Sequence, residues 1–228
     1  MQFSLFNNLH LTVFLFLVIG LVIVYYFRSN KQLKYILASV LITQVIIFNT
    51  KHLLDGTYDI TRYLPLHLCT ISAILAPIAL LTKNKTTQDL VLFWGLIPAL
   101  LAIILPDMNS QDGLMSFRFW EFFVSHIFIV LSAFYLSIHS SSKFSLLKLD
   151  TWRKITVSFL ILIIVAFGIV YPINYLLNSN YMYIIAKASV GMDFLPSGSL
   201  YLPALLALSF VVFVLEAFLY NILNIFKK

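Results

Sequence analysis

Two histidines interrupt segments of the chain that are otherwise apolar. His67 lies in the run Leu64–Leu81, two residues before Cys69, and His126 lies in the run Phe117–Ile138. An imidazole can take up or release a proton near neutral pH, and a thiolate beside an imidazole can act as a nucleophile. These residue types therefore indicate general acid/base chemistry, with Cys69 as a candidate nucleophile and both histidines as candidate catalytic residues.

Helical geometry limits how His67 and Cys69 can cooperate. If Pro65 occupies the first helical turn, His67 and Thr70 share one face of the helix. Cys69 then points about 200° away from His67. A His–Cys pair on one regular helix would thus need a distortion or an interface that reaches both. The alternative is structural: His67 bonds a neighbouring helix and Cys69 is a small apolar filler.

The run Phe117–Ile138 carries three ionisable residues, Arg118, Glu121 and His126. Arg118 and Glu121 are three residues apart and Ser125 follows four residues later, so these three side chains form one stripe. His126 lies about 80° from Arg118 around the helix and deeper in the membrane. Charged groups in hydrocarbon must face protein or water. We expect a cavity that displays both histidines and Glu121, with a structural Arg–Glu pair as the alternative.

The elements that position these residues are predicted to be membrane-spanning helices. Of the 228 residues, 61% are hydrophobic and only 11% are charged, which a soluble core cannot accommodate. Since a span needs roughly 20 apolar residues, about seven spans would use most of the chain. The sequence predicts an all-α polytopic bundle formed by one domain, residues 1–228. The expected spans are Leu9–Phe27, Tyr35–Phe48, Leu64–Leu81, Leu90–Leu105, Phe117–Ile138, Ile155–Tyr171 and Leu200–Ile225, the second of which could instead be re-entrant.

Basic residues cluster in alternate loops, which predicts the orientation. By the positive-inside rule these loops are cytoplasmic, so the N-terminus is outside and the C-terminus inside. The basic residues of these loops are Arg28, Lys31, Lys34, Lys83, Lys85, Lys143, Lys148, Arg153, Lys154, Lys227 and Lys228. The net charge of +6 reflects this topology, and we expect no nucleic-acid partner.

Three outer segments contain further polar candidates: Asn49–Tyr63, Pro106–Ser116 and Pro172–Ser199. Asp107 either caps a turn or reaches the cavity. Asn180, Tyr181 and Lys187 either bind a lipid headgroup, as Arg118 could, or anchor an interfacial segment. Glu216 lies deep in the last span without an obvious partner in the sequence. A single cysteine and scattered histidines predict no cofactor and no metal site. The alternative is a metal ion held by His67, His126 and a carboxylate.

Several short motifs carry a family resemblance. Pro65-Leu66-His67-Leu68-Cys69, Pro106-Asp107, Ser125-His126 and Asn180-Tyr181-Met182-Tyr183 with Lys187 together resemble the YwaF-like integral membrane proteins, over about Leu64 to Leu205. The chain departs from that family at Leu195–Pro203, which lacks tryptophan. That family is similar to a eukaryotic transmembrane acyltransferase that remodels ether phospholipids through a proposed cysteine nucleophile. The cysteine position could correspond to Leu66 instead of Cys69, and His67 remains in either case.

The leading hypothesis is a membrane enzyme that transfers acyl groups of lipids or lipid-anchored substrates in the outer leaflet. His67 would be the general base and Cys69 an optional nucleophile, while His126 and Glu121 relay protons. Asn180 and Lys187 would hold the headgroup. The resemblance implies the bacterial cytoplasmic membrane and lipid partners, and the oligomeric state stays open. Two alternatives are a subunit that binds or transports a small solute in the same cavity, and a non-catalytic scaffold.

Overall fold

The chain folds as a bundle of helices. The computed structural model describes all residues except 1, 83, 110, 140–143, 189–190 and 224–228, and the described residues contain no β-strand. The elements are α1 (Asn8–Tyr26), α2 (Leu33–Leu54), α3 (Leu68–Leu81), α4 (Lys85–Ile104), α5 (Phe117–His139), α6 (Leu149–Val165), the π-helical η1 (Ala166–Val170), α7 (Tyr171–Leu177), the 3₁₀ turns η2 (Tyr181–Tyr183) and η3 (Gly198–Leu200), and α8 (Tyr201–Leu223). The predicted all-α class is confirmed.

Six helical segments are long and apolar enough to cross a membrane. They are α1, α2, α4, α5, the continuous rod Leu149–Leu177, and Gly198–Leu223. The seventh helix, α3, has 14 residues, or about 21 Å at the usual rise, which is shorter than the hydrocarbon core. At 22 residues, α2 is long enough for a full span. The structure therefore confirms the polytopic bundle and places its short member at the helix that follows His67.

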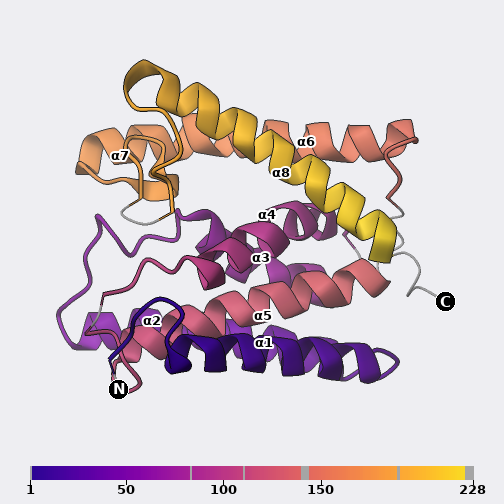
Figure 1. Ribbon diagram of the computed structural model, residues 1–228, viewed down its shortest axis with the longest axis horizontal. Coiled ribbons are helices and arrows are strands. Elements are labelled where there is room, and N and C mark those ends of the chain that lie inside the picture. Colours follow the sequence, from indigo (N-terminus) through magenta and orange to yellow (C-terminus); the bar gives the residue numbers. More distant parts are fainter. Residues whose placement is uncertain (1, 83, 110, 140–143, 189–190, 224–228) are drawn as a thin grey trace.

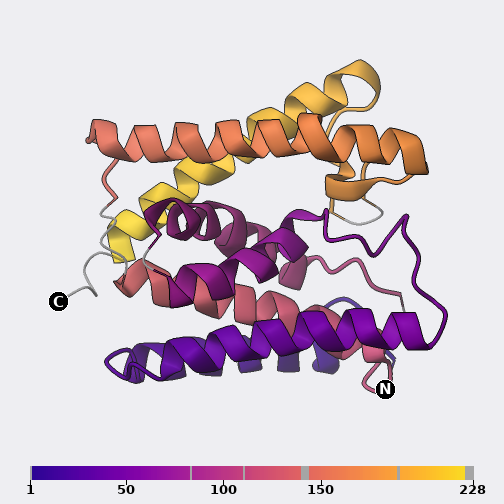
Figure 2. The same ribbon diagram turned by 180° about the vertical axis from the view of Figure 1, so that it is seen from behind.

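The helices form three layers (Figure 1). The rod of α6, η1 and α7 lies with α8 on one side, and α1, α2 and α5 lie on the other, with α3 and α4 between them. Seen from behind, α2 crosses the front of the lower layer (Figure 2). Helix α5 is the most enclosed span, because 72% of its apolar 18-residue stretch is buried, against 17% for the stretch in Gly198–Leu223. The helix with the most ionisable residues is thus the one that faces protein, as the cost of charge in lipid requires.

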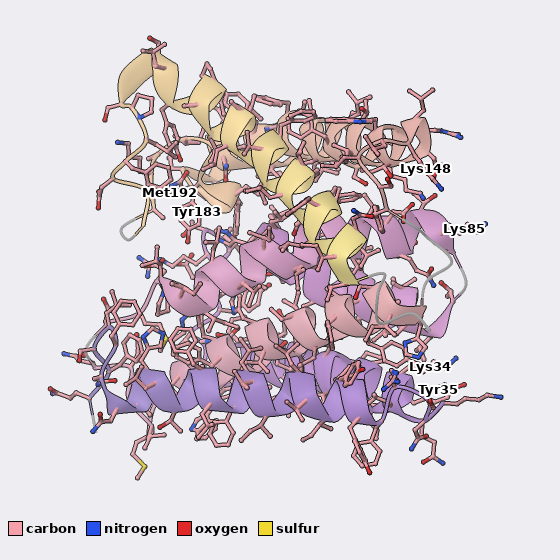
Figure 3. The ribbon with its side chains drawn as sticks, turned by 45° about the vertical axis from the view of Figure 1, so that its right-hand side comes forward. Lys34, Tyr35, Lys85, Lys148, Tyr183 and Met192 are labelled. Carbon is pink, nitrogen blue, oxygen red and sulfur yellow. The ribbon has the colours of Figure 1, made fainter. Side chains whose placement is uncertain are left out.

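The two ends of the bundle differ in charge. Lys34, Lys85 and Lys148 lie together at one end, whereas Tyr183 and Met192 lie at the other (Figure 3). Helix α1 begins at the Tyr183 end and α8 ends at the lysine end (Figure 1), as an odd number of crossings requires. The positive-inside rule predicts that the lysine end is cytoplasmic. Lys83, Lys143, Lys227 and Lys228, which the sequence analysis also placed there, lie outside the described residues.

Several predicted helix boundaries were wrong, and three of them adjoin the outer segments. The apolar run at Leu64 becomes helical only at Leu68, so Pro65 is not in the first helical turn. Helix α2 continues to Leu54 and α7 continues to Leu177, so both outer segments begin later than predicted. Before α3 the chain has a distant partner: the Tyr181 hydroxyl oxygen accepts a hydrogen bond from the Leu64 backbone N–H at 3.0 Å. This bond ties the non-helical residues before α3 to the segment after α7.

Candidate functional site

A large cavity lies within the bundle, toward the end that carries Tyr183 and Met192 (Figure 3). Its volume is about 1490 Å³, and its walls come from α2, α3, α4, α5, α6, η1, α8 and the segments that precede α3 and follow α4 and α7. Pockets for small ligands usually measure roughly 300–1,000 Å³. The cavity is therefore large enough for a ligand bigger than a typical metabolite.

Most of the predicted site residues line this one cavity. Although they come from four parts of the chain, the lining includes His67, Cys69, Asp107, Arg118, Glu121, His126 and Asn180. Tyr181 and Lys187 are not among the described residues that line it. The lining also includes His52, Tyr63 and Tyr183, which the sequence analysis did not select. His52 and Tyr63 stack with ring centroids 4.3 Å apart, a contact between separate segments that no local pattern reveals.

His67 is the residue immediately before α3, and its backbone is extended, with φ −74° and ψ 145°. The helical repeat therefore does not relate His67 to Cys69, which is the second residue of α3. For this reason both residues line the same cavity without any distortion of the helix. Among the described residues, none forms a hydrogen bond with the Cys69 thiol, which is reduced.

The hydrogen bond of His67 defines which ring nitrogen carries the proton. The backbone N–H of Met182 donates to Nδ1 of His67 at 3.4 Å. Because Nδ1 acts as the acceptor, the proton of the neutral ring is on Nε2. The rings of Tyr181 and Tyr183 lie 5.1 Å and 5.4 Å from the imidazole. His67 thus presents an N–H donor and is held between two tyrosines.

His126 has the opposite arrangement. Its Nδ1 lies 2.7 Å from the carbonyl oxygen of Phe122, one turn earlier on α5. A carbonyl can only accept, so Nδ1 carries the proton and the neutral ring has its free lone pair on Nε2. The Phe122 ring packs against the imidazole at 4.2 Å. His126 therefore offers a proton acceptor, and His67 a proton donor, to the same cavity.

Arg118 and Glu121 form an ion pair in the cavity wall. Nη1 of Arg118 donates to Oε2 of Glu121 at 2.8 Å, and their side chains are 41% and 13% exposed. The Arg118 guanidinium also lies 5.3 Å from the Phe122 ring. The Arg–Glu pair, which was expected as a structural alternative, does form, and it lines the same cavity as the two histidines.

The segment after α7 is held by amide side chains. Oδ1 of the buried Asn174 accepts from the Tyr181 N–H at 2.8 Å and from the Ser179 hydroxyl at 2.9 Å, while Nδ2 donates to the Tyr181 carbonyl at 3.0 Å. Asn180 similarly bonds the backbone of Ile185 and Ala186. These bonds fix the segment that contains Met182, whose φ of 56° is left-handed and whose N–H bonds Nδ1 of His67. The amide groups thus position the histidine.

The other polar side chains that were expected to bind a headgroup form hydrogen bonds within the protein. The Tyr181 hydroxyl donates to the Ile60 carbonyl at 2.7 Å, and the Lys187 ammonium donates to the Leu195 carbonyl. The Tyr183 hydroxyl donates to Oδ2 of Asp107 at 3.3 Å. Burial, together with the nearby Asp107 carboxylate, raises the pKa of Tyr183 to about 12. Tyr183 therefore keeps its proton at neutral pH, and Asp107 reaches the cavity as one of its two expected roles requires.

Glu216 has a partner that the sequence did not reveal. Oε1 of this fully buried carboxyl accepts from the backbone N–H of Ile97 at 2.8 Å. Pro98 lies inside α4 and has no N–H, so the carbonyl four residues earlier lacks its usual intrahelical partner. The Ser72 hydroxyl donates to this carbonyl, that of Trp94, at 3.0 Å. Glu216 on α8 and Ser72 on α3 thus bond backbone groups of α4 in the turn before Pro98.

Metal binding receives no geometric support in the part of the chain that is described. Within it, no three His, Cys, Asp or Glu side chains come close enough to hold an ion.

Comparison with known protein families identifies a match over most of the chain. A sequence model described as the TMEM164 family matches residues 3–220, nearly the whole chain. No curated protein and no solved structure matches it.

Proposed function

The chain belongs to the TMEM164 family of membrane proteins, and we propose that it is a membrane-embedded enzyme that transfers an acyl group between lipids. The observation that carries the proposal is the complementary protonation of the two cavity histidines. Nε2 of His126 can accept a proton and Nε2 of His67 can donate one. Acyl transfer needs both abilities, because one hydroxyl loses a proton and one oxygen gains it.

The proposed reaction begins when Nε2 of His126 takes the proton of the acceptor lipid's hydroxyl. The hydroxyl oxygen then attacks the ester carbonyl carbon of the donor lipid, and negative charge develops on the carbonyl oxygen. The N–H of His67 stabilises this oxygen as an oxyanion-hole donor. The bond from the carbonyl carbon to the leaving oxygen breaks, and the proton on His126 passes to that oxygen.

This assignment exchanges the roles that the sequence suggested, since His126 becomes the base and His67 the donor. Arg118 and Glu121 form a polar part of the cavity wall. Asn174 and Asn180 hold the segment whose Met182 N–H bonds His67. Cys69 lines the cavity without a hydrogen bond to either imidazole among the described residues. The direct transfer therefore needs no covalent intermediate on the thiol.

The proposal is tested with purified protein in vesicles that contain a diacyl phospholipid with one isotope-labelled acyl chain and a lysophospholipid acceptor. We expect labelled diacyl product, with turnover lowered at least about 100-fold in His126→Ala and in His67→Ala. The matched control is His139→Gln, since His139 lies outside the cavity and bonds the Arg28 and Tyr135 carbonyls. Unchanged turnover in a His67→Ala, His126→Ala double variant would contradict the mechanism.

A second function, binding or transport of a small solute, is favoured by the charged side chains in the cavity wall. Lys51 pairs with Asp55 there, and Arg62 and Asp112 also line it. This function predicts saturable binding of a polar solute and no labelled product in the vesicle assay. The same assay therefore separates the two functions, while a non-catalytic scaffold would show neither activity.

A further inference from the structure

A second, smaller hollow lies between α2 and α5. Its volume is about 350 Å³, and each helix contributes residues at positions i, i+3, i+4 and i+7, so one stripe of α2 faces one stripe of α5. The α2 stripe is Val40, Thr43, Gln44 and Ile47, with Ser39 beside it, and the α5 stripe is Phe117, Trp120, Glu121 and Val124. Trp120 and Ile47 are half exposed. We call this hollow the α2–α5 groove.

The α2–α5 groove and the central cavity share part of their walls. Gln44, Phe117 and Glu121 line both spaces, so the groove and the cavity adjoin at these three residues. Two of the three are polar, which is unusual on a surface that faces lipid. Oε1 of Gln44 is buried and has no hydrogen-bond partner among the described residues. The groove and the cavity therefore share a partly polar wall.

We propose that the α2–α5 groove holds one acyl chain of the membrane lipid whose ester group reacts in the central cavity. The inference rests on the proposed acyl transfer and adds where the lipid enters: sideways from the bilayer, past Gln44 and Glu121. The groove supplies apolar contact for the chain, and the shared wall leads to the polar cavity.

The chemistry of the two spaces favours this occupant over a second helix or a solute. Outside Thr43, Gln44, Ser39 and Glu121 the groove is lined by aliphatic and aromatic side chains, which match an acyl chain. Next to it, Arg118 lies in the cavity wall beside Glu121. A molecule with an apolar tail and a polar ester or headgroup fits both spaces at once, whereas a small solute fits only the cavity.

The experiment uses the full-length protein in phosphatidylcholine vesicles that contain a diacyl phospholipid with a diazirine in one acyl chain. After illumination, mass spectrometry locates the labelled peptides. We expect labelling of the α2 and α5 groove residues several-fold above that of the lipid-facing surface of α1, where Val18 and Val22 are exposed. Even labelling of all lipid-facing helices would overturn the proposal.

Variants test whether the groove is used during turnover. Thr43→Trp fills the groove, and we expect it to abolish groove labelling and to lower turnover roughly 10- to 100-fold by misplacing the substrate. Ile42→Trp is the matched control, because Ile42 is the adjacent residue, is 43% exposed and does not line the groove. Should Thr43→Trp fail to fold, Ser39→Leu narrows the edge of the groove instead.

The two proposals fail separately in this design. Groove labelling without any labelled product would refute acyl transfer and support lipid binding in the groove. Labelled product with even photolabelling, or turnover unaffected by a folded Thr43→Trp variant, would refute the groove and leave acyl transfer in place.

Discussion

The Tyr183 hydroxyl donates a hydrogen bond to Oδ2 of Asp107 at 3.3 Å, which joins the segment after α7 to the end of α4. The Tyr183 ring also lies 5.4 Å from the His67 imidazole. One side chain thus connects a carboxylate and a histidine that are 40 residues apart in sequence. The geometry of the proposed site depends on this connection.

The Tyr183 hydroxyl should make the fold sensitive to strongly alkaline pH. An unperturbed tyrosine has a pKa of 10.0, and burial beside Asp107 raises the pKa of Tyr183 to about 12. Between these values the unfolded chain releases the proton and the folded chain keeps it, so this contribution to stability is present below pH 10 and is lost as pH rises. We expect the melting temperature in detergent to fall less steeply over this window in Tyr183→Phe than in the wild type. Equal slopes would show that Tyr183 ionises freely in the folded protein.

Asn174 should be required for the position of His67. Its amide makes three hydrogen bonds within the segment, two of them to the backbone of Tyr181. Asn174→Ala leaves these buried groups without partners, which should lower the free energy of unfolding by about 1–3 kcal/mol. Thermal unfolding followed by tryptophan fluorescence measures the loss. The control is Tyr175→Phe, since Tyr175 is the next residue and is 76% exposed.

A further readout tests whether Asn174 acts through His67. Limited proteolysis of Asn174→Ala should cut first within the segment after α7, and turnover should fall without a change in the position of the α1 and α5 spans. Proteolysis that begins in other loops would show that the amide supports the whole bundle equally.

The spans and the polar cluster could be predicted from the sequence because both depend on local residue types. An apolar run predicts a helix in the membrane, and Arg118, Glu121 and His126 are conspicuous within such a run. Contacts between distant segments could not be predicted in this way. The hydrogen bonds of Leu64 and His67 come from Tyr181 and Met182, more than 110 residues later.

The amide side chains show the same limit. Asn180 and Tyr181 are residue types that can bind a lipid headgroup. In the structure, however, their hydrogen bonds go to the backbone of Ile60, Leu64, Ile185 and Ala186. Composition identifies that a segment has polar groups, whereas the fold determines whether those groups are already bonded. His52, which lines the cavity, escaped selection because it lies at the end of a helix instead of within an apolar run.

Removing the thiol should have little effect on the proposed reaction. Cys69→Ala deletes only Sγ, and the direct transfer uses the two imidazoles alone. We expect turnover within about threefold of the wild type in the vesicle assay, because a small side chain in a cavity wall contributes mainly packing. Loss of turnover in a folded Cys69→Ala variant, with a hydroxylamine-sensitive acyl adduct on the wild-type protein, would establish a thioester route instead.

Glu216 should act through its acceptor oxygen. Oε1 accepts from the Ile97 N–H next to Pro98, and the carboxyl is fully buried. Glu216→Gln keeps an acceptor oxygen and removes the ionisable group, so we expect stability close to that of the wild type. Glu216→Leu leaves the Ile97 N–H without a partner in an apolar environment, which should cost about 1–3 kcal/mol.

Thermal unfolding of both Glu216 variants in detergent distinguishes the acceptor role from a requirement for charge. Leu215→Ala serves as the control for a change on the same turn of α8, since Leu215 is half exposed on the lipid-facing side. If Glu216→Gln is as unstable as Glu216→Leu, then the carboxyl itself is needed and the second oxygen, Oε2, must have a function beyond the bond to Ile97. If both variants are as stable as the wild type, the Ile97 N–H finds another acceptor and does not need α8.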